Sequence, residues 1–200
     1  MKKFSELSLK NYLDELSSEA PVPGGGSVAA YVISLAMGLT QMVGRVSLKR
    51  KMKAGLSPED EKKELERRET IQNIIDAVEK TKKDAFQIVD LDPEVYEQVL
   101  QTSGDAQKME DVLENAFRLQ ADLAFLGVMA REFNANMAGL VSGSIKNDLL
   151  VSAELLKAGF MGAYDTAMIN VKYMKQEDRK KRAEQALGEL KSRFEKGPSL

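Results

Sequence analysis

Hydrophobic side chains recur along this chain at helical spacing, and no segment shows the two-residue alternation of a β-strand. The clearest case is the stretch 58–89, where lysine and glutamate fill the positions between the apolar ones. Its apolar positions are Leu65, Ile71, Ile74, Ile75, Val78, Ala85, Phe86 and Val89. The pattern predicts an all-α fold, which we expect to be an up-and-down bundle of long antiparallel helices in a single domain, 1–200.

Helix boundaries are predicted from capping residues and breakers. Ser8 is expected to cap a short helix ending near residue 17, and Ser57, followed by a proline, to start the long helix. Pro93 is expected to end or kink that helix just after Asp92, because proline lacks an N–H and clashes with the preceding turn. Further helices are predicted over residues 105–137, residues 146–174 and a charged C-terminal segment.

The segment 27–46 is almost uncharged and precedes a run of basic residues, a pattern that membrane anchors share. Its middle carries polar residues and the rest of the chain is amphipathic, so a core helix wrapped by other helices is the favoured interpretation. Ser27 is expected to be the N-cap of this helix, which would run to about Ala54. Small residues recur every four positions and predict a close helix–helix contact: Ala30, Ser34 and Gly38.

Composition narrows the chemistry. The chain has 200 residues, 43% hydrophobic and 30% charged, which suits one globular domain. A net charge of −2 gives no positive field for nucleic acid or anionic lipid, so neither partner is expected. The absence of Cys and His excludes thiol nucleophiles, disulfides, Ser-His-Asp triads and the usual zinc sites, and no metal is expected. The N-terminus does not resemble a signal peptide, so we expect a cytoplasmic protein.

A glycine-rich loop is the best-defined local motif, with the sequence Pro23-Gly24-Gly25-Gly26-Ser27-Val28-Ala29-Ala30. It places free backbone N–H groups at the start of a buried helix, where they can hold a carboxylate or a ring carbonyl. A tight turn with a serine cap explains the same residues without a ligand, and the residues alone favour that reading.

This octapeptide resembles the signature of the formimidoyltetrahydrofolate cyclodeaminase and methenyltetrahydrofolate cyclohydrolase family. Three later segments resemble family motifs in the same order: Val89-Asp90-Leu91-Asp92-Pro93-Glu94-Val95-Tyr96, Asn147-Asp148-Leu149 and Ile169-Asn170-Val171. Asp92 matches the acid/base aspartate of the family, and Asp148 matches the aspartate of its Ser-Asp motif.

The resemblance implies a set of site residues. Asp92 and Asp148 would be catalytic, and substrate would be bound by Gly24, Gly25, Gly26, Ser27, Lys49, Arg50, Ser144, Asn147 and Asn170. The basic residues would attract the glutamate tail of a folate. Simpler alternatives remain: Asp92 as the N-cap before Pro93, Asp148 as an acid that stabilises a first helical turn, and the lysines as a solvated loop.

The sequence also departs from the family pattern. Ser142 and Ser144 stand where the family has asparagines, and Asn147 replaces its serine. Gln120 stands where the family tends to have proline, a change expected to affect helix shape rather than chemistry.

The implied reaction is cyclodeamination of 5-formimidoyltetrahydrofolate to 5,10-methenyltetrahydrofolate and ammonia, with no cofactor beyond the folate substrate. Two alternatives stay open, a methenyltetrahydrofolate cyclohydrolase and a non-catalytic folate-binding homologue. The resemblance further implies a homodimer with the folate site near the subunit interface, and it makes a formiminotransferase a candidate partner.

Overall fold

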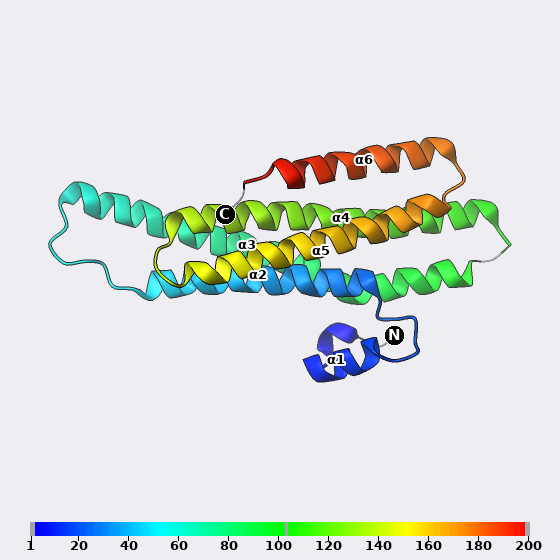
Figure 1. Cartoon of the computed structure of the whole chain (residues 1–200), viewed down its shortest axis with the longest axis horizontal. Coiled ribbons are helices and arrows are strands. Elements are labelled where there is room, and N and C mark those ends of the chain that lie inside the picture. Colours follow the sequence, from blue (N-terminus) through cyan, green and yellow to red (C-terminus); the bar gives the residue numbers. More distant parts are fainter. Residues whose placement is uncertain (1–2, 103, 199–200) are drawn as a thin grey trace.

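The protein is described by a computed structural model that covers residues 3–102 and 104–198 (Figure 1). Within those ranges every regular element is a helix, which confirms the predicted all-α class. A 3₁₀ turn at Phe4–Glu6 precedes six α-helices: α1 (Leu9–Leu16), α2 (Gly25–Lys49), α3 (Pro58–Gln101), α4 (Ala106–Leu140), α5 (Lys146–Tyr173) and α6 (Glu177–Lys196).

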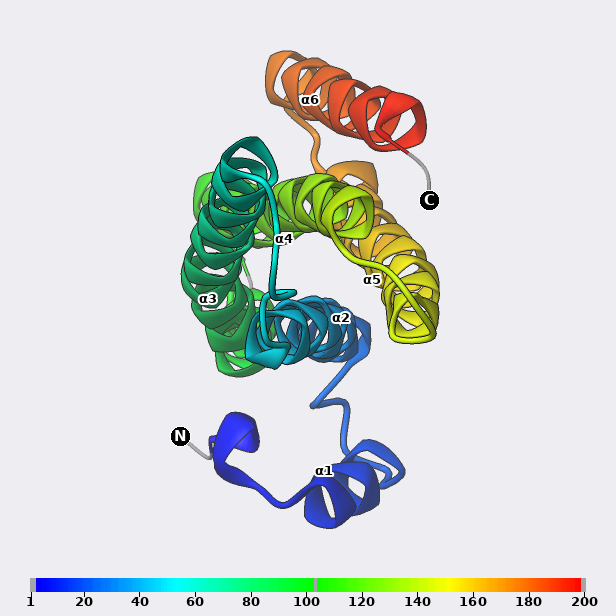
Figure 2. The same cartoon turned by 90° about the vertical axis from the view of Figure 1, so that its left-hand side faces the viewer.

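Helices α2 to α5 form an antiparallel bundle in which each helix packs against its neighbours in chain order and α5 closes back on α2 (Figures 1 and 2). Helix α6 lies outside against α4 and α5, and α1 lies on the side of α2, where its Tyr12 packs against Tyr31. The loops after α2 and α4 are therefore at one end of the bundle, and the loops after α3 and α5 are at the other. This up-and-down topology matches the predicted arrangement.

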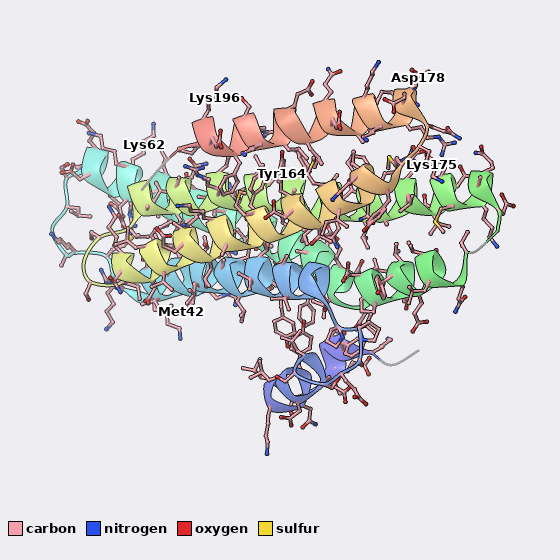
Figure 3. All side chains as sticks on the ribbon, turned by 45° about the vertical axis from the view of Figure 1, so that its right-hand side comes forward. Met42, Lys62, Tyr164, Lys175, Asp178 and Lys196 are labelled. Carbon is pink, nitrogen blue, oxygen red and sulfur yellow. The ribbon has the colours of Figure 1, made fainter. Side chains whose placement is uncertain are left out.

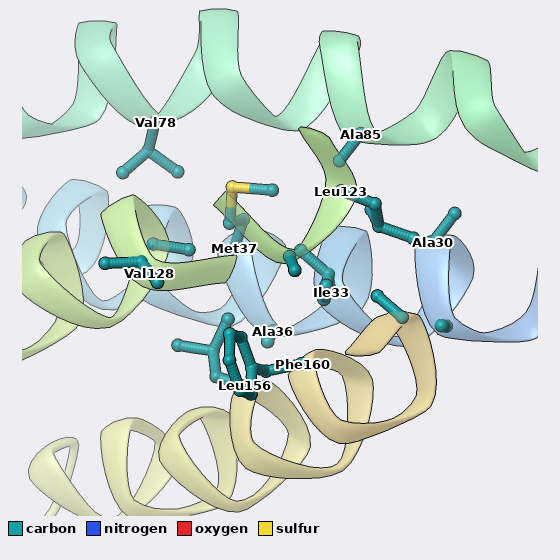
Figure 4. Packing of buried hydrophobic residues seen from close by; sticks show 14 of the residues in the cluster. Ala30, Ile33, Ala36, Met37, Val78, Ala85, Leu123, Val128, Leu156 and Phe160 are labelled. Carbon is teal, nitrogen blue, oxygen red and sulfur yellow. The ribbon is translucent and has the colours of Figure 1, made fainter. Parts of the chain in front are cut away.

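All four bundle helices contribute to one apolar core. Figure 4 shows Ile33 and Met37 of α2 facing Leu123 of α4 and Phe160 of α5, and each of the four is at most 1% exposed. Burial of a side chain of this size stabilises the fold by about 1.5–3 kcal/mol. The core therefore fixes how the four helices sit relative to one another, and with them the residues at each end.

Helix α2 is long and apolar enough to span a membrane by length and composition alone. In the bundle, 61% of its apolar window is buried against other helices. The surface that mimics a membrane anchor is thus used for core packing, which supports the core-helix interpretation of segment 27–46.

Three predicted boundaries are wrong. Gly24, not Ser27, is the N-cap of α2, because Gly25 and Gly26 both adopt helical conformations, and α2 ends at Lys49 rather than near Ala54. Pro93 neither ends α3 nor marks its boundary, because the helix continues to Gln101. By contrast, Ser8 accepts from the Asn11 N–H and Ser57 from the Asp60 N–H, so both predicted caps are confirmed.

The close approach to another helix that the structure shows along α2 is at Ala29 and Ile33, and Gly38 of the predicted stripe takes no part in it. A methyl group at Gly38 would meet nothing within 4 Å. On the facing helix α5, a Cβ at Gly159 would lie 2.5 Å from Ile33 Cγ1 and 3.3 Å from the Ala29 carbonyl oxygen. The missing side chain that lets α2 and α5 approach closely is therefore that of Gly159 on α5.

This difference gives a stability prediction. Gly38→Ala is expected to raise the free energy of unfolding by about 0.5–1 kcal/mol, because alanine costs less conformational entropy in a helix and nothing obstructs its methyl group. Gly159→Ala is expected to lower the same free energy. Urea unfolding followed by circular dichroism measures both, and a destabilised Gly38→Ala protein would contradict the packing described for that position.

Candidate functional site

A cavity of about 650 Å³ opens between the start of α2, the second half of α3, the start of α4 and the end of α5. Most of its wall is apolar, from residues such as Val95, Val99, Leu113 and Leu119. Its polar groups are Gly24, Gly25, Gly26, Asp92, Thr166, Asn170 and Lys175, together with two tyrosine hydroxyls. Among the described wall residues Asp92 is the one acid and Lys175 the one cation.

Asp92 is held in this wall by two hydrogen bonds from different helices. The Ser27 backbone N–H at the start of α2 donates to Oδ2 at 2.9 Å, and Gln120 Nε2 of α4 donates to Oδ1 at 2.7 Å. Because Asp92 lies inside α3 and faces the cavity, the N-cap interpretation of this residue is wrong. Asp92 and the glycine loop do converge, as the family resemblance implies.

Pro93 explains how α2 docks on α3. Since proline has no N–H, the carbonyl of Val89, four residues earlier, receives no helical hydrogen bond. The Ser27 hydroxyl donates to that carbonyl at 2.9 Å. The Tyr12 hydroxyl lies 3.0 Å from Ser27 Oγ and donates to it, since the Ser27 hydrogen is already engaged. The proline that was expected to break α3 instead leaves a free acceptor at which the start of α2 is anchored.

Ser27 therefore has a structural place in the site. Its side chain is fully buried and does not contribute to the cavity wall. The predicted substrate contact does not fit this position, because the hydroxyl bonds Val89 and Tyr12 and the backbone N–H bonds Asp92.

Gly26 is the point of closest approach. A Cβ there would lie 2.2 Å from both Asp92 Oδ1 and Gln120 Nε2, well inside contact distance. At Gly25 the nearest atom to such a Cβ would be Thr166 Oγ1, at an ordinary 3.7 Å. Gly26 thus makes room for the carboxyl of Asp92 and the amide of Gln120. This packing requirement could not be recognised from the loop sequence alone.

The environment of Asp92 favours its protonated form. Burial raises the pKa of the Asp92 carboxyl above its ordinary value, and this exceeds the opposing effect of the hydrogen bonds from Ser27 and Gln120. A raised pKa keeps more of the acid form near neutral pH, which is the form that donates a proton.

Helix α5 supplies the facing polar wall. Asn170, a predicted site residue, lines the cavity. Its Nδ2 donates to the Thr166 carbonyl at 3.1 Å, a bond that does not use the side-chain oxygen of Asn170. Thr166 and Lys175 also line the cavity and were missed from the sequence. The one available signal for Thr166 was its position four residues before Asn170, on the same helical face.

The other predicted site residues lie at the far end of the bundle. Asp148 and Asn170 are 22 positions apart in α5, about 33 Å at the rise of an α-helix. Ser144 and Asn147 are close to Asp148, and Lys49 and Arg50 end α2, about 36 Å from the glycine loop. Arg50 Nη1 donates to the Ser142 carbonyl at 3.1 Å, which joins these two segments. Within one chain Asp148 therefore does not converge with Asp92, because antiparallel packing puts the start of α5 beside the end of α2.

Gln120 is the main residue that sequence reasoning misjudged. Its replacement of a family proline was expected to alter helix shape only. Instead, its side chain crosses from α4 to α3 and bonds Asp92. No local pattern marks this role, because the two residues are 28 positions apart and meet only in the folded bundle.

Comparisons with known proteins identify the family of this chain. A sequence profile of the family described as Formiminotransferase-cyclodeaminase matches residues 8–189. Formimidoyltransferase-cyclodeaminase of Mus musculus is 25% identical over 180 residues, which cover 84% of this chain and 31% of that protein. The chain thus spans about a third of the length of this relative.

A solved structure has the same fold. Formiminotetrahydrofolate cyclodeaminase from Thermotoga maritima matches with a TM-score of 0.86 at 23% identity, over 96% of this chain and 92% of that one.

Proposed function

The chain belongs to the formiminotransferase-cyclodeaminase family, as its motifs predict, and from this premise we propose that it catalyses the cyclodeamination of 5-formimidoyltetrahydrofolate. The observation that carries the proposal is a buried carboxyl group, Asp92, held by two donors in the wall of a largely apolar cavity. The cavity volume of about 650 Å³ lies in the range of small-molecule sites.

In the proposed reaction N10 of the folate attacks the formimidoyl carbon, the five-membered ring closes and ammonia leaves. The neutral substrate gives a methenyl cation and ammonia, so one proton must be supplied. Asp92 is the proposed donor of that proton to the departing nitrogen, and it is reprotonated from solvent. Both reacting nitrogens belong to one molecule, so the remaining work is to hold the substrate in the conformation that closes the ring.

The other wall residues have proposed binding roles. The N–H groups of Gly25 and Gly26, in the first turn of α2, are suited to a carbonyl or other polar edge of the pterin ring. Asn170 and Thr166 would bind polar atoms on the opposite side, and Val95, Val99 and Leu113 would contact the flat ring.

Lys175 is the proposed contact for the carboxylates of the folate tail. It lies in the turn between α5 and α6 (Figure 3), and its backbone N–H is held by the buried Glu110 carboxylate at 2.6 Å. We expect Lys175→Ala to raise KM about 5- to 10-fold with little change in kcat, because it removes uniform binding. Lys172→Ala, an exposed lysine outside the cavity, is the matched control in steady-state kinetics. Equal KM values for the two variants would contradict this role.

The reaction is tested by following methenyltetrahydrofolate absorbance with purified protein. Formation from 5-formimidoyltetrahydrofolate that Asp92→Ala abolishes supports a cyclodeaminase that uses this carboxyl. Consumption of methenyltetrahydrofolate alone supports the cyclohydrolase alternative, in which water attacks the methenyl carbon. Binding of tetrahydrofolate without either reaction supports a non-catalytic homologue, and no binding at all contradicts every folate role.

We further propose that the protein forms a homodimer and is located in the cytoplasm. Large apolar side chains are exposed on two neighbouring helices, Leu35 on α2 and Leu150 and Val151 on α5, at 52%, 52% and 46%. Such groups favour a subunit interface. Light scattering during size-exclusion chromatography measures the mass of the assembly, and a monomer at micromolar concentration contradicts the dimer.

A formimidoyltransferase is a candidate partner, because the mouse relative is named for both activities.

A further inference from the structure

Gln120 contains an unexplained polar atom. The side chain is 1% exposed and its Nε2 donates to Asp92, but its Oε1 has no hydrogen-bond partner. Over residues 3–102 and 104–198, this oxygen is the one buried side-chain nitrogen or oxygen atom that has no hydrogen-bond partner. A buried acceptor without a partner destabilises a fold, so a glutamine here needs a reason that an apolar side chain of similar size would not supply.

The surroundings of Gln120 point to Asp92. Asp92 Oδ1 and Gln120 Nε2 both occupy the space that a Cβ at residue 26 would fill, so Gly26 packs against the pair. The carboxyl is held at each oxygen, by the Ser27 N–H on one side and by Gln120 on the other. With both contacts present, rotation of the carboxyl about its terminal bond is blocked.

We propose that Gln120 is a positioning residue that holds the Asp92 carboxyl toward the cavity in both of its protonation states. The ionised carboxylate accepts from Nε2, as observed. A protonated carboxyl can donate to Oε1 once the amide makes a half-turn, because that oxygen has no competing partner. The amide thus offers a donor to one state and an acceptor to the other, while an apolar residue offers neither. The inference rests on the proposed role of Asp92 as the proton donor.

Few other charges act on this pair. Tyr12 of α1 is a nearby titratable group, and the charge of Asp92 contributes to raising its pKa. Lys175 is the cation in the same cavity wall. The groups that contact the carboxyl from α2 and α4 are a backbone N–H and a neutral amide. A change in the titration of Asp92 on substitution of Gln120 is therefore assigned to the lost hydrogen bond.

The first test needs no activity. Carbon-13 NMR of aspartate carboxyls in the unliganded protein, with Asp92→Asn to assign the signal, gives the titration midpoint of Asp92. A hydrogen bond from Gln120 to the ionised carboxylate is stronger than one to the neutral acid, so it lowers the pKa of Asp92, and Gln120→Leu is expected to move the midpoint to higher pH. Gln120→Glu, which has the same shape and a like charge, is expected to move it further in the same direction.

The second test is kinetic. We expect Gln120→Leu to lower kcat by roughly 10- to 100-fold with KM nearly unchanged, because misplacement of a reacting group affects the chemical step. The fall in rate at high pH, where Asp92 loses its proton, is expected to move to higher pH along with the NMR midpoint. A glutamine that only fills space would leave both the midpoint and the pH profile where they are.

Asn134→Leu is the matched control. Asn134 is another 1% exposed amide on α4, 14 positions from Gln120, and it bonds the Leu149 carbonyl rather than Asp92. It is expected to lower thermal stability without moving the Asp92 midpoint. If Gln120→Leu does not fold, Gln120→Glu carries the same measurements.

The outcomes separate the two proposals. A wild-type protein without activity whose Asp92 midpoint still rises in Gln120→Leu contradicts the proposed reaction and supports the contact. An active protein whose midpoint and pH profile are unchanged in both Gln120 variants overturns the positioning role and leaves the reaction standing.

Discussion

Asp92→Asn is expected to lower turnover by roughly 10²- to 10⁴-fold, the usual contribution of a general acid, while the protein stays folded. Asparagine has the shape of aspartate and can still accept from the Ser27 N–H, so the start of α2 keeps its contact with α3. It cannot donate a proton of suitable acidity. The loss is therefore assigned to chemistry rather than to folding.

The same variant is expected to be more stable than wild type at neutral pH. Burial raises the pKa of Asp92 in the folded state, so the folded protein binds more protons than the unfolded chain above about pH 4. The free energy of unfolding contributed by this group is thus largest at low pH and falls as pH rises through the folded pKa. Asparagine does not titrate and carries no such loss.

Thermal unfolding between pH 4 and pH 8 measures this effect. The difference in Tm between Asp92→Asn and wild type should grow as pH rises. Glu79→Gln is the control, because hydrogen bonds from Gln41 and Lys82 lower the pKa of Glu79 to about 2. The stability that this carboxylate contributes is lost only as pH falls below about 4, so its Tm difference should stay nearly constant over the range measured. For Asp92→Asn, a Tm difference that is constant with pH, together with full turnover, would contradict both the buried acid and its catalytic role.

Gly26→Ala is expected to abolish measurable turnover and to destabilise the protein by about 1–3 kcal/mol, the usual cost of overpacking. The added methyl group would lie 2.2 Å from Asp92 Oδ1 and from Gln120 Nε2, so the carboxyl and the amide must separate or α2 must move away from α3. Either movement breaks the arrangement that orients Asp92.

Gly25→Ala separates this packing effect from a general loss of glycine. Its methyl group would lie 3.7 Å from Thr166 Oγ1, so near wild-type stability is expected. Urea unfolding and the absorbance assay compare the two variants. Equal behaviour of the two alanine variants would show that the contact at Gly26 does not determine the site.

Part of the site predicted from the family motifs lies at the far end of the bundle. Ser144, Asn147 and Asp148 closely follow Ser142, whose carbonyl accepts from Arg50 at the far end of α2. Family motifs in a linear sequence do not reveal which end of an antiparallel bundle each one occupies. That assignment depends on helix length and direction, which the structure supplies.

The sequence by itself determined the helical class, the caps at Ser8 and Ser57, the burial of segment 27–46 and the choice of Asp92 as a candidate site residue. These features depend on periodicity, on capping within four residues or on a motif, all of which are local in the chain. The break expected at Pro93 does not occur, and the carbonyl of Val89 that the proline leaves without a helical partner is bonded by Ser27, 62 positions away. Only the tertiary structure decided that Gln120 and Gly26 surround Asp92, since contacts between helices depend on how whole faces pack, and no local pattern records them.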